Sequence, residues 1–293
     1  MLTTLNEILG KAKREGYGVA APDAYSSSSV MACFKAAENL KAPLIVSCLG
    51  TTNMEETGEN VKFYARKYPD AVVTLHLDHG GPFEEIMRAL RSGYTSVMID
   101  RSKLPFEENV REVREVVRIA HAMGVSVEAE LGHVGTGTEY DKTRDSGLTH
   151  KEEARRFVEE TGVDALAVAV GTSHGVYKGT PKLEFELLRE IASLVTVPLV
   201  LHGGSGTGDE NLKKCIACGI QKINLFTDMA NPAGEAMALY MRGESSEEPD
   251  ISAALEMFSG KKKNYYVAPM VGAEVYQRKL EHYIRLFGSA GRV

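Results

Sequence analysis

Short apolar runs alternate along the chain with longer segments whose apolar residues recur at helical spacing. Near-continuous apolar runs of this length are typical of strands buried on both faces of a parallel sheet. The runs predict eight strands, at Gly18–Ala21, Leu44–Ser47, Val72–Leu77, Ser96–Ile99, Ser126–Glu130, Ala165–Val170, Leu199–Leu201 and Lys222–Leu225. The segments between them predict eight helices, at Met31–Leu40, Gly58–Lys67, Pro82–Arg91, Glu107–Ala122, Lys151–Glu160, Phe185–Ser193, Glu210–Cys218 and Met229–Tyr240.

Eight strands separated by helices favour a closed parallel barrel of the TIM type, which takes about 250 residues. The chain has 293 residues and shows no internal repeat or linker, so we expect one α/β domain over residues 1–293. A doubly wound sheet is the alternative, but it usually has fewer strands and a G-x-G-x-x-G turn near its start. No such turn is present there.

Both ends of the chain extend beyond this alternating pattern. Residues 1–16 (MLTTLNEILGKAKREG) predict an amphipathic helix, because acidic Glu7 interrupts the apolar run that a signal peptide would need. A final helix is predicted at Gly272–Phe287, after the polar insertion Gly243–Asn264. We therefore expect a barrel with an N-terminal helix and a C-terminal helical extension.

A polar, glycine-rich segment, Gly132–Leu148, separates the fifth strand from the next helix. Long loops of this kind are often active-site lids, although composition fits a merely mobile loop equally well. Thr149 and Glu152 follow in the T-x-x-E spacing of a capping box, which predicts that Thr149 caps the next helix.

Composition and charge narrow the range of partners. The net charge of −6 argues against a nucleic-acid backbone as the main partner, while a local site for an anionic metabolite is still allowed. No apolar run approaches the roughly 20 residues of a membrane span, so no membrane partner is expected.

Four cysteines are too few for a disulfide scaffold and favour a reducing cytoplasm. Cys215 and Cys218 form a C-x-x-C, which two small apolar residues on one helix explain better than redox or zinc chemistry.

Chemically active residues gather at the carboxyl ends of the predicted strands, which meet at the active-site face of a TIM barrel. His79, His174 and His202 stand at three such ends, each beside a glycine. One such histidine would more often be a hydrogen-bonded structural residue, but three at neighbouring ends predict a divalent-metal site. Neutral imidazoles suit zinc, and three protein ligands with an open fourth position are typical of catalytic zinc.

Carboxylates surround the predicted metal site. Asp78 directly precedes His79, and a carboxylate beside a metal but not on it is suited to general acid–base catalysis. Asp100 and Glu130 stand at the ends of the next two strands. There they could bind a second cation, orient a histidine or serve a structural role.

The loops after the seventh and eighth strands predict a phosphate site, which is its usual position in this fold. Gly203, Gly204, Ser205 and Gly206 expose backbone amides, and Ser205 and Thr227 add hydroxyl donors. A tight turn alone would also explain the glycines. A metal, an acid–base carboxylate and a phosphate cradle together suit aldol chemistry, although isomerisation through an enediolate would use the same parts.

A specific set of motifs runs in order through nearly the whole chain. The motifs are HLDHG, SVMIDRSKLPFEENV, VEAELGHVG, GVDALAVAVGTSHGVYKG, PLVLHGGSG, KINLFTD and LFGSAGR. Together they resemble the class II, metal-dependent ketose-bisphosphate aldolases, which include the fructose- and tagatose-bisphosphate aldolases. The resemblance implies a lyase of carbohydrate metabolism that releases dihydroxyacetone phosphate and an aldehyde from a phosphorylated ketose.

The resemblance also implies a role for each matching position. Asp78 matches the proton donor to the aldehyde half, and Glu139 in the lid is the candidate base for the ketone α-proton, with Asp141 as its rival. The positions that match ligands of zinc or another divalent ion are His79, His174 and His202, and those that match an alternative or second metal position are Asp100 and Glu130. The positions that match contacts to the dihydroxyacetone-phosphate half are Gly175, Gly203, Gly204, Ser205, Asn224, Leu225, Phe226 and Thr227. A monovalent cation (Na⁺ or K⁺) near the phosphate and a homodimer or homotetramer are further implications.

Three positions depart from the family pattern. After its first strand the family commonly has A-F-N, whose asparagine contacts substrate, whereas this chain has Asp23 in that place. Leu49 replaces a serine that is common in the fructose enzymes, and Phe226 replaces a small or polar residue. We therefore expect Asp23 to contact substrate, and a phosphorylated ketose other than fructose 1,6-bisphosphate to be preferred.

Three alternative functions are weighed against this one. A Schiff-base aldolase would need a lysine on an inner strand, typically on the sixth, and the sixth strand, ALAVAV, has none. A metal-dependent ketose-phosphate isomerase or epimerase would be distinguished by its products. A non-catalytic sugar-phosphate-binding protein would be favoured by loss of Asp78 or of a ligand histidine, and neither is lost.

Overall fold

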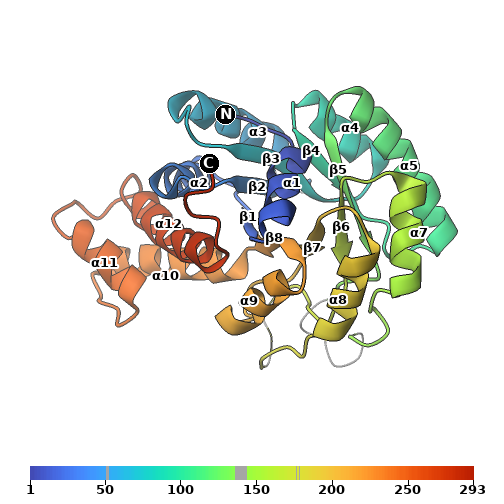
Figure 1. Cartoon of the computed structure of the whole chain (residues 1–293). Helices are drawn as coiled ribbons and strands as arrows, with labels where there is room; N and C mark the ends of the chain where they lie inside the picture. The colour runs from blue at the N-terminus through green and yellow to red at the C-terminus, as the bar shows by residue number, and fades with distance from the viewer. Residues whose placement is uncertain (51–52, 136–143, 176, 178) are drawn as a thin grey trace.

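The computed structural model describes residues 1–50, 53–135, 144–175, 177 and 179–293. Within these residues, eight parallel strands form one sheet in the order β1-β8-β7-β6-β5-β4-β3-β2. The two outer strands of that order also meet, because Asp23 and Ser47 form a parallel bridge and the Ala24 amide donates to the Ser47 carbonyl at 2.9 Å. The sheet is therefore a nearly closed barrel surrounded by helices (Figure 1), and the predicted TIM barrel is confirmed.

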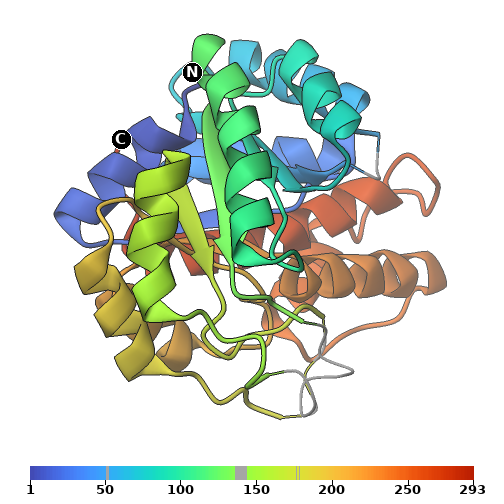
Figure 2. The ribbon, with the colours of Figure 1, turned by 90° about the vertical axis from the view of Figure 1, so that its right-hand side faces the viewer.

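The strands lie where the apolar runs predict them, with bounds that differ by no more than a few residues. They are β1 (Val19–Pro22), β2 (Leu44–Leu49), β3 (Val73–Gly80), β4 (Ser96–Ile99), β5 (Ser126–Leu131), β6 (Ala165–Val168), β7 (Leu199–Leu201) and β8 (Ile220–Leu225). The helices are α1 (Leu5–Glu15), α2 (Ser27–Leu40), α3 (Met54–Lys67), α4 (Phe83–Arg91), α5 (Phe106–Ala122), α7 (Lys151–Thr161), α8 (Phe185–Leu194), α9 (Asp209–Ala217), α10 (Thr227–Arg242), α11 (Pro249–Met257) and α12 (Ala268–Leu286). Figure 2 shows the green and yellow-green helices α5 and α7 side by side on the outside of the strands.

The capping role predicted for Thr149 is wrong. Its hydroxyl donates to the Leu131 carbonyl at 2.5 Å and accepts a hydrogen bond from the Ala169 amide at 2.8 Å. Thr149 thus joins the ends of β5 and β6, and α7 begins one residue later, after His150, without a side-chain cap. Because buried backbone groups need hydrogen-bond partners, the Thr149 hydroxyl bonds the Leu131 carbonyl and the Ala169 amide and does not cap α7.

The C-terminal extension contains a helix, α11, that the sequence pattern does not predict. Pro249 occupies its first turn, and the Glu248 carboxylate accepts the Ile251 amide at 2.7 Å. Both features favour a helix start. In Figure 1 the helices α10, α11 and α12 form a group at one side of the barrel, coloured orange to red.

Helix α1 covers the amino-terminal end of the barrel. A capping box between Thr4 and Glu7 begins it, and its buried face carries Leu5, Ile8 and Leu9. These side chains belong to one buried cluster with residues of the strands, namely Ile45, Met98, Ala165, Ala167 and Val200. The apolar face of α1 therefore fills the end of the barrel opposite the carboxyl ends of the strands.

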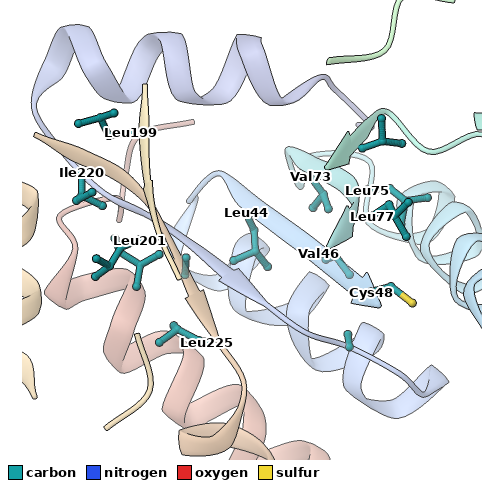
Figure 3. Packing of buried hydrophobic residues seen from close by; sticks show 14 of the residues in the cluster. Leu44, Val46, Cys48, Val73, Leu75, Leu77, Leu199, Leu201, Ile220 and Leu225 are labelled. Carbon is teal, nitrogen blue, oxygen red and sulfur yellow. The ribbon is translucent and has the colours of Figure 1, made fainter. Parts of the chain in front are cut away.

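Alternate residues of each strand face outward and inward. The outward set packs against the helices and forms the larger apolar core; Figure 3 shows it at Leu44, Val46, Cys48, Val73, Leu75, Leu77, Leu199, Leu201, Ile220 and Leu225. In β3 His76 and Asp78 alternate with the outward Leu75 and Leu77, and in β8 Lys222 and Asn224 alternate with Ile223 and Leu225. Polar side chains therefore collect inside the barrel.

Within the described residues, disulfide bonds and membrane-spanning helices are both absent. All four cysteines are buried and none forms a disulfide, in keeping with the apolar interpretation of Cys215 and Cys218. None of the helices described combines the length and hydropathy needed to cross a lipid bilayer.

We predict that Leu9→Ala lowers the free energy of unfolding by about 2–5 kcal/mol, because truncation of a buried leucine leaves a cavity at the barrel end. Leu9 is fully buried. Urea unfolding followed by circular dichroism measures the change, and Arg14→Ala on the exposed face of α1 is the matched control. Equal stability of Leu9→Ala and wild type would show that α1 is not part of the cooperative core.

Candidate metal centre and active site

The end of β3 turns two consecutive side chains toward the barrel mouth. The pairing of β3 with β4 shifts register between Leu77 and Gly80, and His79 adopts a left-handed backbone conformation (φ 47°) that is rare outside glycine. A side chain at Gly80 would place its Cβ 2.2 Å from the Met98 carbonyl oxygen. The bulge therefore needs glycine, and it lets Asp78 and His79 both line the same cavity.

The three predicted ligand histidines converge at this mouth. The ring centroid of His79 lies 4.8 Å from that of His174 and 4.5 Å from that of His202, which are 5.8 Å apart. One ring nitrogen from each lies within 4.8 Å of the others. Two nitrogens on one tetrahedral zinc lie about 3.4 Å apart, so this donor set fits one divalent ion after small shifts.

Hydrogen bonds aim the imidazoles. His79 places Nδ1 3.1 Å from Asp100 Oδ2, and its Nε2 lies 2.9 Å from His202 Nδ1. Asp100 is itself fixed, because its Oδ1 accepts the Ser102 amide at 3.0 Å and the Ser102 hydroxyl at 2.7 Å. His79 Nε2 and His202 Nδ1 are thus the nitrogens turned toward the cation site, where Asn224 Nδ2 also lies 3.4 Å from His202 Nδ1.

Glu130 offers an oxygen toward a second group of donors. Its Oε1 accepts the Val134 amide at 2.9 Å, while its buried Oε2 has no hydrogen-bond partner among the described residues. His79, Asp100 and Glu130 place one ligand atom each within 4.8 Å of the others. An unpartnered buried carboxylate oxygen is costly unless a cation or another donor reaches it, so this group fits a second cation position.

Burial and neighbouring charges shift the titration of the site. Burial opposes a charge on His79, but Asp78, the hydrogen bond to Asp100 and Glu130 outweigh it and raise its pKa to about 10. Burial and the charge of His79 lower the pKa of His174 to about 4. Burial would raise the pKa of Asp78, but the histidines and Lys222 outweigh it and lower the pKa to about 2. The site therefore holds an ionised Asp78 beside two different histidines. His79 favours the protonated form, whereas His174 favours the neutral form.

A cavity of about 730 Å³ opens over this centre and is lined by most of the predicted site residues. The predicted site residues that line the cavity are Asp23, Asp78, His79, Asp100, His174, Gly175, Gly203, Gly204, Ser205, Asn224, Leu225, Phe226 and Thr227. His202 and Glu130 lie deeper and are almost completely buried. Leu225 lines the cavity and also belongs to the apolar core.

The predicted phosphate loops meet beside the histidines. Gly203 has φ 67°, and a Cβ there would lie 2.3 Å from the Ser173 carbonyl oxygen, so the close approach of the two loops requires glycine. The Ser205 hydroxyl accepts the amides of Phe226 at 3.0 Å and Asp228 at 3.3 Å. Helix α10 begins at Thr227, and its Asp228 amide points to the Ser205 hydroxyl, so the amino-terminal end of the helix, which favours anions, lies beside this cradle.

The three departures from the family pattern surround one end of the cavity. Asp23, Leu49 and Phe226 all line it, and the Phe226 ring packs edge-on against Tyr25 with centroids 5.6 Å apart. Burial and the neighbouring Asp78 raise the pKa of Asp23 well above its usual range. Its Oδ1 is buried and has no hydrogen-bond partner within the described part of the chain.

The candidate lid bases, Glu139 and Asp141, lie outside the described residues. Both borders of that segment are held to the barrel. His174 donates its amide to the Gly135 carbonyl at 2.8 Å, and Arg144 donates to the Lys182 carbonyl at 3.0 and 3.1 Å. Gly135 and Arg144 therefore both bond to the loop between β6 and α8, which carries the ligand His174.

Two residues below the histidines were missed in the sequence. Glu128 Oε1 lies 2.9 Å from His202 Nε2, and Glu128 Oε2 accepts from Lys222 Nζ at 2.8 Å. Both side chains are fully buried. A period-two pattern could have revealed them, because Glu128 precedes Glu130 and Lys222 precedes Asn224 by two residues, which puts each pair on one strand face.

Comparison with known proteins supports one family for the whole chain. A family model described as fructose-bisphosphate aldolase class-II matches residues 3–292. The fructose-bisphosphate aldolase of Thermus caldophilus is 39% identical over 320 aligned residues that cover 100% of both chains.

Solved structures agree with this match. The YdjI aldolase from Escherichia coli K12 is 32% identical with a TM-score of 0.82, covering 100% of this chain and 99% of that one. A putative fructose-1,6-biphosphate aldolase from Coccidioides immitis is 27% identical with a TM-score of 0.79, covering 98% and 97%. The chain therefore belongs to the class II fructose-bisphosphate aldolases, a family of metal-dependent lyases.

Proposed function

We propose that this aldolase cleaves a phosphorylated ketose to dihydroxyacetone phosphate and an aldehyde, with zinc or another divalent ion at His79, His174 and His202. The observation that carries the proposal is the convergence of three imidazoles beside Asp78 and a backbone-amide cradle. A bound divalent ion supplies a Lewis acid for the substrate carbonyl. Asp100 and Glu130 would hold an alternative or second metal.

Asp78 is proposed as the proton donor to the oxygen of the aldehyde half when the carbon–carbon bond forms, and in cleavage its ionised carboxylate accepts that proton. It lines the cavity without belonging to the group of three histidines, and Asn224 donates to its Oδ1 at 2.9 Å. That bond fixes the carboxylate orientation. For the proton on the ketone α-carbon, Glu139 remains the candidate base and Asp141 its rival.

The phosphate of the ketose is proposed to bind between the loops after β6, β7 and β8. Gly175, Gly203, Gly204 and Ser205 line this part of the cavity with backbone amides and one hydroxyl, and Thr227 begins α10 there. A sodium or potassium ion near the phosphate would offset its charge. The cradle positions the substrate so that its carbonyl faces the histidines.

Assembly and location are also proposed. Tyr265 and Tyr266 are 82% exposed, and Met257 is 55% exposed in the same C-terminal extension. Exposed large apolar side chains of this kind favour a homodimer or homotetramer. Four buried thiols without a disulfide suit a reducing cytoplasm. Residues 1–293 are proposed to form one catalytic domain.

We predict that removal of divalent metal with a chelator abolishes cleavage and that zinc or cobalt restores it. Triose-phosphate release from a panel of ketose phosphates measures the activity and also separates an aldolase from an isomerase, which yields no fragments. Full activity in metal-free protein would contradict the proposed role of the three histidines.

We predict that Asp78→Ala keeps metal and phosphate binding but lowers kcat by about 10²–10⁴-fold, the usual contribution of a general acid–base group. Steady-state kinetics and metal content measure the two properties on the same preparation. Turnover within a few-fold of wild type would remove Asp78 from the chemical step.

We predict that Asp23→Asn combined with Leu49→Ser raises kcat/KM for fructose 1,6-bisphosphate by roughly 5–150-fold. The reason is that an unpaired polar group of the substrate costs about 1–3 kcal/mol in the pocket formed by Asp23, Leu49 and Phe226. Each single variant is the control for the pair. If the wild type already cleaves fructose 1,6-bisphosphate as fast as any other ketose phosphate tested, this account of specificity is wrong.

A further inference from the structure

A lysine lies in the interior of the barrel, directly beneath the histidines. Lys222 comes from β8, and its side chain has no exposed surface. Lysine is almost never fully buried unless it is paired, because an ammonium group without partners loses its hydration. The contacts of Lys222 therefore indicate what it stabilises.

The ammonium group has three neighbours from two other strands. It donates to Glu128 Oε2 at 2.8 Å and lies 3.3 Å from His76 Nε2 and 4.0 Å from Asp78 Oδ1. All of these side chains are buried. An ammonium has three donors and no acceptor, so Lys222 can only donate, to Glu128 and His76, while Asp78 lies at ion-pair distance.

The donor-only character of Lys222 determines which ring nitrogen of His76 and of His202 carries a hydrogen. Because Lys222 can only donate, His76 Nε2 accepts and His76 Nδ1 carries the hydrogen that it donates to the Ser96 hydroxyl at 2.8 Å. On the other side, the Glu128 carboxylate that pairs with the Lys222 ammonium offers only acceptor oxygens. His202 Nε2, which lies 2.9 Å from Glu128 Oε1, must therefore carry a hydrogen.

A hydrogen on Nε2 leaves Nδ1 of neutral His202 with its lone pair. That nitrogen faces the site, 2.9 Å from His79 Nε2. The chain of contacts from Lys222 through Glu128 thus ends at the nitrogen that a metal would use. Lys222 lies on β8, Glu128 on β5 and His202 directly after β7, so the tautomer of His202 depends on contacts that cross the barrel.

We propose that Glu128 and Lys222 are positioning residues that hold His202 in the tautomer whose Nδ1 binds the metal. Glu128 fixes the hydrogen on Nε2, and Lys222 prevents the carboxylate from turning away by occupying its second oxygen. This inference rests on the proposed function, because it assumes that His202 is a metal ligand. Residues that orient ligands in this way commonly change metal affinity by 10–100-fold.

Metal affinity provides the test. Zinc dissociation constants are measured by competition with a chromophoric chelator for Glu128→Leu, Glu128→Gln and Lys222→Met. The first and third should bind zinc about 10–100-fold more weakly than wild type. Glu128→Gln should also weaken zinc binding, because its single amide oxygen cannot accept from both His202 Nε2 and Lys222 Nζ and its NH2 group would face one of these two donors.

A control variant separates this role from general destabilisation. Gln221 neighbours Lys222 on β8, is nearly buried and accepts the Leu199 amide at 3.0 Å, so Gln221→Met removes a buried hydrogen bond away from the site. We expect it to lower thermal stability without changing zinc affinity. Equal zinc affinity in wild type, Glu128→Leu and Lys222→Met would overturn the proposal.

A crystal structure of the zinc-loaded wild type tests the same claim if the variants do not fold. The proposal requires coordination through His202 Nδ1, with Nε2 still on Glu128. Coordination through Nε2, or a carboxylate turned away, would overturn it. A wild type that binds no zinc, or a His174→Ala variant that binds zinc as tightly as wild type, would instead contradict the proposed function.

Discussion

Charge buried inside a closed barrel is the constraint on which the rest of this structure depends. Asp78, Glu128 and Glu130 are almost fully buried, and an isolated carboxylate in such a place would be very costly. Lys222 and the histidines compensate for them, and a bound cation would add to this compensation. The same groups that would catalyse the reaction therefore need one another in order to be buried, which links metal binding to the integrity of the barrel interior.

The barrel geometry makes this concentration of charge possible. Parallel strands point their carboxyl ends to one face, and the period of two places alternate side chains inside. Helix α1 supplies apolar side chains at the opposite end, so the interior changes from apolar at Leu5 and Leu9 to charged at Lys222 and Glu128. The bulge at His79 adds one more inward side chain than regular alternation would allow.

Much of this arrangement could be predicted from the sequence, for identifiable reasons. The strands Ser96–Ile99 and Leu199–Leu201 were predicted with their observed bounds, because short apolar runs between polar segments are strong signals. The histidines were identifiable because each stands where a predicted strand ends beside a glycine. By contrast, the partners of Thr149 and Lys222 lie on other strands, and their hydrogen bonds depend on strand register, which residue type and spacing do not determine. Helix α11 was missed because a nine-residue helix in a charged segment gives only a weak periodic signal.

X-ray absorption at the zinc edge of the purified protein tests the central claim most directly, because it reports the atoms bound to the ion. The account predicts about three imidazole nitrogens at roughly 2.0–2.1 Å with no sulfur, and a loss of one imidazole or of the ion itself in His174→Ala. Sulfur scattering at about 2.3 Å, which would point to Cys215 and Cys218, or an unchanged spectrum in His174→Ala would contradict it.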